Sequence, residues 1–198
     1  MIVVIDYRAG NLYNVGHALK YLKVPFQFSG DPAVVASAEK VILPGVGSAR
    51  PAMQSLEDQG LFNTIRNLKV PFLGICLGLQ LLFEQSEEES TPCLNVLPGT
   101  IRKFDSHKVK VPHIGWNTLD INPGSISLLE GIPSGSFFYF VHSYYAPIGP
   151  YTVARTRYGA ELSSIVQRGN FWGVQFHPER SGGLGLRLLQ NFLSLPTT

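Results

Sequence analysis

The stretch Lys69-Val70-Pro71-Phe72-Leu73-Gly74-Ile75-Cys76-Leu77-Gly78-Leu79-Gln80-Leu81-Leu82-Phe83 decides the fold of this 198-residue chain. Residues 70–75 form a short apolar run that is typical of a buried strand, and residues 77–83 predict the first two turns of a helix. Cys76 stands at the joint, with glycines two residues before and two residues after it. Such glycines permit the sharp, closely packed strand-turn-helix elbow that displays a nucleophile above a parallel sheet.

The position of Cys76 favours a reactive thiol. Backbone N–H groups and the positive end of the following helix would face the sulfur and favour the thiolate, which is the nucleophilic form. The alternative is a buried core cysteine, because free cysteine is among the most buried residue types. The glycines on both sides favour the reactive interpretation.

Composition predicts a packed soluble protein. Hydrophobic residues make up 44% of the chain and charged residues 15%, and 198 residues suit one domain spanning residues 1–198. The net charge of +2 is too small to indicate a nucleic-acid or membrane partner. Cys76 and Cys93 have neither metal-ligand nor disulfide spacing, so we expect a reducing compartment and no metal or other cofactor.

The beginning of the chain predicts a strand and not a signal peptide, because residues 2–5 are apolar and Asp6 follows at once. No apolar run approaches the ~20 residues that a membrane span needs. We therefore expect a cytoplasmic protein.

Strands and helices alternate in the first half. Residues 2–5, 25–28 and 41–43 predict strands, residues 12–22 predict a helix, and Asp31 can cap a helix that begins at Pro32. This alternation indicates a parallel sheet covered by helices. The acidic run at residues 84–90 predicts a solvated helix end and loop.

The second half is richer in strands. We expect it to add antiparallel strands to the edge of a mostly parallel sheet, giving an α/β fold. A closing helix is predicted over residues 182–195. The segments with strand character are residues 100–104, 109–111, 137–141, 151–156, 164–167 and 171–176.

The loop Pro44-Gly45-Val46-Gly47-Ser48 follows the third predicted strand. Two glycines free its backbone to turn N–H groups toward an anion, which is what an oxyanion hole requires. A tight turn is the common explanation of such a run when it stands alone. Loops at the carboxyl ends of neighbouring parallel strands share one crevice, however, and Cys76 ends the next predicted strand.

His177 and Glu179 supply the other groups that a nucleophilic thiol needs. Pro178 biases His177 toward an extended backbone, and positions i and i+2 of an extended chain project to one side. A thiol needs a base, and the base needs a third group to fix its tautomer. Cys76, His177 and Glu179 provide these three types of side chain.

Two aromatic stretches, residues 112–117 and 139–145, carry more rings than a solvent-facing loop needs. Core packing explains Phe138, Phe140 and Val141. Trp116 and Tyr139 lie next to polar residues and glycines, and for them a protein interface and core packing are equally good explanations.

Three motifs together resemble the class I (triad) glutamine amidotransferases. They occur in the family's order, and the resemblance runs from Ile2 to the final helix. Residues 112–117, residues 139–145 and the loop Gly10-Asn11 narrow it to the glutaminase subunits of imidazole glycerol phosphate synthases. The three motifs are Pro44-Gly45-Val46-Gly47, Gly74-Ile75-Cys76-Leu77-Gly78-Leu79-Gln80 and Gln175-Phe176-His177-Pro178-Glu179.

The resemblance implies a flavodoxin-like three-layer fold and hydrolysis of glutamine to glutamate and ammonia. It implies a heterodimer with a (β/α)8-barrel cyclase subunit, which uses the ammonia in histidine biosynthesis. Cys76 would be the nucleophile, His177 the general base and then acid, and Glu179 the orienting carboxylate. Other positions carried over by motif are the oxyanion-hole backbone of Val46, Gly47 and Leu77, the glutamine-binding Gly45, Gln80, His142, Ser143 and Tyr144, and the partner-facing Asn11, Trp116, Tyr139 and Arg180.

The chain departs from the family pattern at two positions. Arg180 stands where lysine is expected, which keeps the positive charge but not its geometry. Leu79 stands where methionine is usual, a swap that conserves volume.

Three alternatives stay open at this point. The chain could serve another class I amidotransferase with a different ammonia acceptor, it could be a non-catalytic regulatory subunit of the same fold, or it could be a cysteine hydrolase with an unrelated substrate. A further hypothesis concerns regulation: the Pro-Gly-x-Gly loop could leave the oxyanion hole incomplete until the partner and its ligand bind.

Overall fold

The computed structural model describes residues 1–8, 12–122 and 127–197. The strands are β1 (Ile2–Ile5), β2 (Phe26–Ser29), β3 (Lys40–Gly45), β4 (Phe72–Cys76), β5 (Gln85–Ser86), β6 (Thr91–Pro92), β7 (Thr100–Lys103), β8 (His113–Thr118), β9 (Asp120–Ile121), β10 (Phe137–His142), β11 (Tyr144–Tyr145), β12 (Thr152–Tyr158), β13 (Ala160–Arg168) and β14 (Phe171–Val174). The helices are α1 (Leu12–Tyr21), α2 (Pro32–Ala36), α3 (Ala49–Asp58), α4 (Leu61–Arg66), α5 (Leu77–Gln80) and α6 (Gly182–Ser194), with the 3-10 turns η1 (Glu88–Ser90), η2 (Ser127–Leu129) and η3 (Pro178–Arg180).

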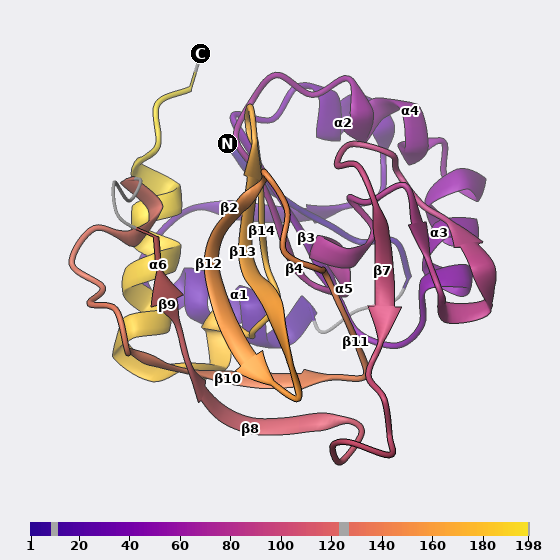
Figure 1. Ribbon diagram of the computed structural model, residues 1–198. Helices are drawn as coiled ribbons and strands as arrows, with labels where there is room; N and C mark the ends of the chain where they lie inside the picture. Colours follow the sequence, from indigo (N-terminus) through magenta and orange to yellow (C-terminus); the bar gives the residue numbers. More distant parts are fainter. Residues whose placement is uncertain (9–11, 123–126, 198) are drawn as a thin grey trace.

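A large mixed sheet forms the centre of the molecule, in the order β2-β1-β3-β4-β14-β13-β12-β9 (Figure 1). The first five of these strands are parallel, and β13, β12 and β9 continue the sheet in antiparallel pairing. Counted along the chain, the parallel strands follow the order 2-1-3-4-5 of the flavodoxin-like fold. The expectation of an α/β fold with a mostly parallel sheet and added antiparallel strands is confirmed.

Helices cover both faces of this sheet because its side chains alternate. Along β1, Val3 and Ile5 enter one hydrophobic core, whereas Ile2 and Val4 enter the other. The first core contains the buried side chains of α2, α3 and α4, and the second contains those of α1 and α6. Figure 1 shows the two groups of helices on opposite sides of the sheet. The result is a three-layer arrangement in which both halves of the chain contribute strands to one sheet.

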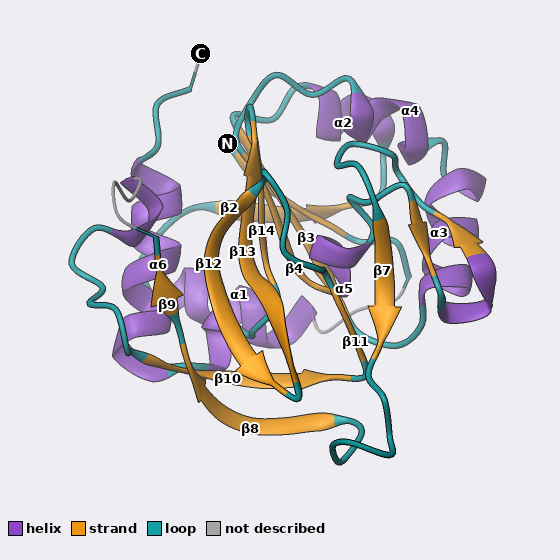
Figure 2. Cartoon of the chain, viewed as in Figure 1, coloured by secondary structure: helices purple, strands orange, loops and turns teal. Residues whose placement is uncertain are grey.

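Two smaller sheets complete the second half. β8 and β10 form an antiparallel ribbon, and β11, β7, β5 and β6 form a sheet of their own. Figure 2 shows the ribbon crossing one end of the molecule. The N–H of His177, just after β14, donates to the carbonyl of Tyr139 in β10 at 2.9 Å, so the ribbon lies against the carboxyl end of the large sheet.

Two predicted elements are wrong in extent or type. Residues 109–111 are not a strand: the N–H groups of Lys108 and Val109 both donate to the carbonyl of Asp105, which closes a turn. The predicted helix over residues 77–83 is only α5, because the carbonyls of Leu81 and Leu82 accept from N–H groups of residues 94–97 and the helix cannot continue.

The predicted solvated loop at residues 84–90 is also more ordered than expected, since it contains β5 and η1.

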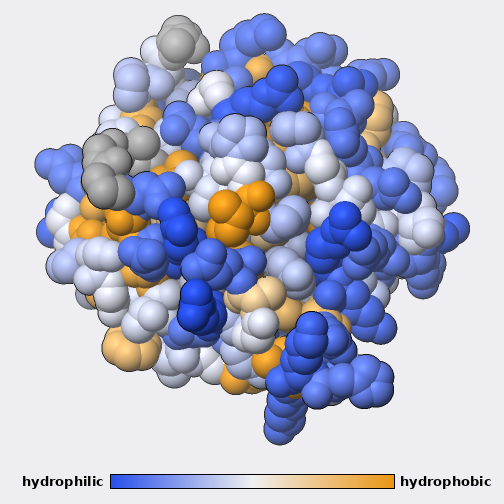
Figure 3. All heavy atoms as spheres, in the orientation of Figure 1, coloured by the Kyte–Doolittle hydropathy of each residue, from blue (hydrophilic) through white to orange (hydrophobic). Residues whose placement is uncertain are grey.

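On the face shown in Figure 3, hydrophobic residues form small separate groups among hydrophilic ones. Among the residues that the structure describes, no helix is long and apolar enough to cross a bilayer.

Candidate active site

Cys76 ends β4 and stands at the first turn of α5, as the elbow predicts. The strained backbone is that of Cys76 itself, with φ 54° and ψ −105°, a conformation that disfavours residues with a Cβ. The flanking glycines serve close packing instead. A Cβ on Gly74 would lie 2.4 Å from the carbonyl oxygen of Gly78, and one on Gly78 would lie 2.0 Å from that of Leu43. The glycines therefore let α5 pack directly on β3 and β4.

The register of β3 and β4 brings the 44–48 loop beside the thiol. Gly45 pairs with Cys76, so Val46 and Gly47 follow at the mouth of the same crevice. Gly47 has φ 94°, a value that favours glycine. Gly45 itself does not line the cavity described below, and a Cβ there would approach that of Leu77 to 2.6 Å. Close packing against Leu77 thus explains the glycine at position 45.

His177 and Glu179 form the expected pair. Nδ1 of His177 and Oε1 of Glu179 are 2.7 Å apart, and the two side chains are 3% and 1% exposed. The predicted route to this contact is wrong, since Glu179 lies in the 3-10 turn η3 and only His177 is extended. The turn begun by Pro178 folds the carboxylate back onto the imidazole.

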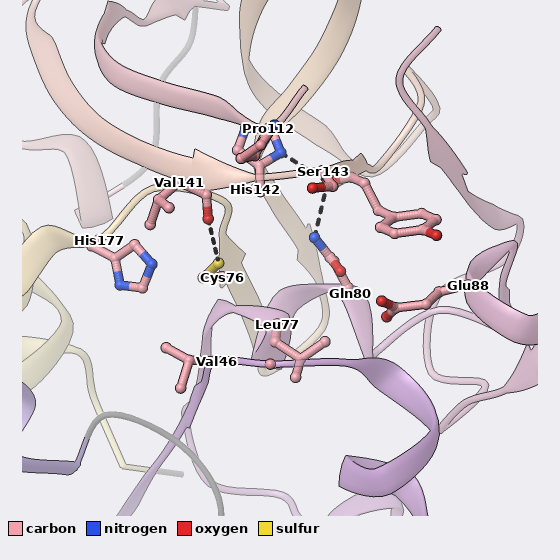
Figure 4. Close-up of a pocket in the computed structure, with 12 residues that line it drawn as sticks. Val46, Cys76, Leu77, Gln80, Glu88, Pro112, Val141, His142, Ser143 and His177 are labelled. Atoms are coloured by element: carbon pink, nitrogen blue, oxygen red, sulfur yellow. Dashed lines mark hydrogen bonds between the residues drawn. The ribbon is translucent and has the colours of Figure 1, made fainter. Parts of the chain in front are cut away.

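The two neighbours of His177 control its protonation. Burial alone would lower the pKa of His177, but the nearby Cys76 sulfur and the Glu179 carboxylate outweigh burial and raise this pKa to about 10. Figure 4 shows the imidazole beside the Cys76 sulfur. The site therefore holds an imidazolium next to the thiol at neutral pH, an arrangement suited to nucleophilic catalysis.

A cavity of about 310 Å³ opens over the thiol (Figure 4). It brings together nine residues that the sequence predicts as site residues: Val46, Gly47, Cys76, Leu77, Gln80, His142, Ser143, Tyr144 and His177. Glu88, Pro112 and Val141 also line it, and none of these three was predicted. The carbonyl of Val141 lies 3.7 Å from the Cys76 sulfur.

The amide of Gln80 is held by its neighbours. Its Nε2 donates to the carbonyl of Tyr144 at 2.9 Å and to Oε1 of Gln175 at 3.3 Å, which uses both of its hydrogens. Gln80 therefore offers the cavity only its acceptor, Oε1. Gln175 in turn places Nε2 3.8 Å from the Cys76 sulfur, so this fully buried side chain contacts the site although the sequence analysis did not predict it as a site residue.

Glu88 is the second missed residue. Its carboxylate lines the cavity, and its Oε2 accepts from the N–H of Ala49 at 2.7 Å, which ties η1 to the start of α3. The sequence placed Glu88 in an acidic run that looks solvated, and its spacing carries no signal of a pocket residue. Glu88 and Gln80 both line the cavity, and Figure 4 shows the Glu88 carboxylate beside the Gln80 side chain.

Three predicted partner-facing residues form a surface cluster: Trp116 of β8, Tyr139 of β10 and Arg180 of η3. Trp116 is 56% exposed, its ring lies 6.0 Å from that of Tyr139, and the Arg180 guanidinium lies 4.5 Å over Tyr139. Ile114 and Phe137 of the same two strands are also exposed. Asn11 lies outside the described residues.

Three hydrogen bonds, which we call the Ser181 clamp, join this surface cluster to His177. Tyr139 accepts from the N–H of His177, and its own N–H donates to Oγ of Ser181 at 3.0 Å. The Ser181 hydroxyl donates to the carbonyl of His177 at 2.6 Å. The backbone of His177 is thus fixed directly to β10.

Within the described part of the chain, no three His, Cys, Asp or Glu side chains are arranged to hold a metal ion.

Comparison with known proteins gives one consistent result. The family model for class-I glutamine amidotransferases matches residues 3–195. The chain is 48% identical to the imidazole glycerol phosphate synthase subunit HisH of Herpetosiphon aurantiacus, over 98% of this chain and 94% of that protein. It is 45% identical to subunit HisH 2 of Legionella pneumophila, over the full length of both.

Solved structures show the same fold at low sequence identity. A glutamine amidotransferase crystal structure matches with a TM-score of 0.75 and 20% identity, covering 98% of this chain and 97% of that one. The structure of PurLQS from Thermotoga maritima matches with a TM-score of 0.73 and 21% identity, over 97% and 96% of the two chains.

Proposed function

The chain belongs to the class-I glutamine amidotransferase family, and on that premise we propose that it is the glutaminase subunit of an imidazole glycerol phosphate synthase. It hydrolyses glutamine to glutamate and ammonia and passes the ammonia to a cyclase subunit in histidine biosynthesis. The observation that carries the proposal is the buried His177–Glu179 pair beside Cys76 in one cavity.

The chemistry follows from the positions of these three side chains. The Cys76 thiolate attacks the side-chain carbonyl carbon of glutamine, and backbone N–H groups of the 46–47 loop and Leu77 stabilise the oxyanion, each worth about 3 kcal/mol in comparable sites. The His177 imidazolium gives its proton to the departing ammonia. The neutral imidazole then takes a proton from water, which attacks the thioester and releases glutamate. Glu179 keeps the imidazole in the tautomer that both steps need.

The far end of the cavity orients the substrate. Glu88 and Oε1 of Gln80 are acceptors on one side of it, and the α-ammonium of glutamine is a matching donor. The amide end of the substrate then points toward Cys76, beside the oxyanion loop. Ser143 and Tyr144 close the wall between these two ends.

The surface cluster of Trp116, Tyr139 and Arg180 is the proposed contact with a (β/α)8-barrel cyclase subunit, in a cytoplasmic heterodimer. Exposed aromatic and arginine side chains are the usual anchors of protein interfaces. Because the Ser181 clamp joins this cluster to His177, partner binding and the geometry of the base are coupled.

We test the activity with a thiol-reactive glutamine analogue and a glutaminase assay on the complex with the cyclase subunit. The analogue should label the wild-type chain and C93S, and it should not label C76S. Cys93 is the matched control because it is also buried, and burial raises its pKa to about 12. Labelling of C76S, or a wild-type complex that releases no glutamate, would instead support a non-catalytic subunit.

Activation by the partner is tested by the same assay. The chain alone and the complex with the nucleotide substrate of the cyclase are compared, and we expect the complex to be much faster because the 46–47 loop completes the oxyanion hole only there. Equal rates would refute this part of the proposal.

A further inference from the structure

Two histidines outside the triad form a buried pair across the β8–β10 ribbon. The strand register places His113 opposite His142, and their rings are almost fully buried. Nδ1 of His113 lies 3.0 Å from Nε2 of His142, and Nδ1 of His142 lies 2.8 Å from the carbonyl oxygen of Tyr144. The catalytic steps described above use neither ring.

The direction of each hydrogen bond in this pair is determined by its last acceptor. A carbonyl oxygen only accepts, so Nδ1 of His142 must carry the proton. In a neutral ring Nε2 is then an acceptor, and Nδ1 of His113 must donate to it. Nε2 of His113 accepts in turn, and Nδ2 of Asn117, 3.4 Å away, supplies the donor. Both rings are therefore Nδ1–H tautomers.

The surroundings of the pair keep both rings uncharged. Tyr158 stacks on His113 with the ring centroids 3.9 Å apart, and Phe104 and Phe140 contact both imidazoles. Burial lowers the pKa of His113 to about 4 and that of His142 to about 3. The hydrogen bonds from Asn117 through His113 and His142 to Tyr144 thus keep the same donors and acceptors throughout the physiological pH range.

This series of hydrogen bonds ends at the cavity over the Cys76 thiol, which we call the glutamine pocket. The carbonyl of Tyr144 accepts from His142 and from Gln80, which occupies both of its lone pairs. The second hydrogen of Gln80 goes to Gln175. The position of the Tyr144 carbonyl therefore decides whether the Gln80 amide presents its oxygen or its NH2 group to the substrate. If this carbonyl moved, the amide could turn and present donors to the cationic end of glutamine.

We propose that His113 and His142 are positioning residues of the glutamine pocket, which hold the Tyr144 carbonyl and through it the acceptor of Gln80. The inference rests on the proposed glutaminase function and deepens it. The series of hydrogen bonds begins at Asn117, which is next to Trp116 of the surface cluster in β8. The two histidines therefore connect this part of β8 with the pocket.

The test measures glutamine binding by calorimetry in the C76A background, in complex with the cyclase subunit, so that no turnover is needed. H142L and H113L should each weaken glutamine affinity about tenfold. H113N should bind within about threefold of the parent, because the asparagine amide reproduces the Nδ1 donor. F140L is the matched control: it removes ring packing against both histidines and leaves the hydrogen bonds, so affinity should be unchanged.

A second readout keeps the inference testable if a leucine variant does not fold. Imidazole ¹⁵N spectra of the wild-type chain should show Nδ1–H and bare Nε2 for both rings from pH 5 to 8. An Nε2–H tautomer on either ring, leucine variants that bind glutamine as the parent does, or H113N as weak as H113L would overturn it. If the C76A parent itself binds no glutamine, the proposed function fails, and the spectra still decide the tautomers.

Discussion

His177 and His142 line the same cavity, are both almost fully buried, and have opposite protonation states. The pKa of His177 is raised to about 10, whereas that of His142 is lowered to about 3. Burial lowers both. The difference comes from the partners: His177 has a carboxylate and a thiol, and His142 has a carbonyl and an uncharged ring. Charge on His177 also lowers the pKa of His142, so the two states are linked.

The largest expected effect comes from Cys76→Ala. Glutamate formation should fall at least about a thousandfold, as on loss of other catalytic nucleophiles. The pKa of His177 should fall as well, because the nearby Cys76 sulfur is the foremost influence that opposes burial. Steady-state kinetics and NMR titration of the imidazole measure the two quantities. C93A is the control and should leave both unchanged; a C76A protein whose His177 still titrates near 10 would contradict this account.

Glu179→Gln removes the second influence. The carboxylate stabilises the imidazolium, so the pKa of His177 should fall from about 10. Since the imidazolium supplies the proton to ammonia, the alkaline limb of the kcat/KM profile should move to lower pH, and kcat should fall tenfold or more. E161Q, on the surface at Arg157, is the matched carboxylate change. An alkaline limb that stays in place would show that Glu179 only orients the ring.

Asn117→Asp gives the neutral pair a charged neighbour. A carboxylate about 3.4 Å from Nε2 of His113 should raise the pKa of this ring from about 4 by about 1 to 3 pH units. The new acceptor also opposes the Nδ1–H tautomer, so we expect a loss of stability of about 1–3 kcal/mol. NMR titration and thermal melting measure these changes. N117S, which is uncharged, should not raise the pKa of His113. An unchanged pKa of His113 in N117D would show that residue 117 does not act on the histidine pair.

Arg180→Ala should have the smallest effect. It tests whether the charge of Arg180 changes the pKa of His177 although the two side chains do not interact. Arg180 follows Glu179 but stacks on Tyr139, and the imidazolium of His177 does not depend on it. The pKa of His177 should therefore stay near 10. Affinity for the cyclase subunit should fall about two- to fivefold, because Arg180 belongs to the proposed partner contact and its cation–π stacking orders Tyr139. R180K is the conservative control, and a changed pKa in R180A would mean that the guanidinium acts on the triad.

Sequence patterns predict the first half of this chain well because its signals are local. Alternating apolar runs predict β1, β3 and β4, and the glycines around Cys76 predict an elbow that the structure contains. The strain at the elbow was harder to foresee. It falls on Cys76, while the glycines permit close contacts with Leu43 that depend on the neighbouring strand.

The missed residues depend on contacts between distant parts of the chain. Gln175 reaches Gln80, 95 residues away, and Glu88 reaches Ala49, 39 residues away. Their positions at the site follow from the packing of distant segments around one cavity, and no spacing in the sequence encodes this packing. His113 likewise gains its partner only through the register of β8 with β10. The roles assigned to the site residues by resemblance stay predictions until the variants above are measured.

The backbone conformation of Cys76 sets catalysis against stability. Its φ of 54° and ψ of −105° cost about 1–3 kcal/mol for a residue with a Cβ, and glycine would avoid that cost. The substitution C76G would therefore end catalysis and stabilise the fold in a single mutation. Folding stability alone therefore does not explain a cysteine at this position, whereas the proposed nucleophilic role does.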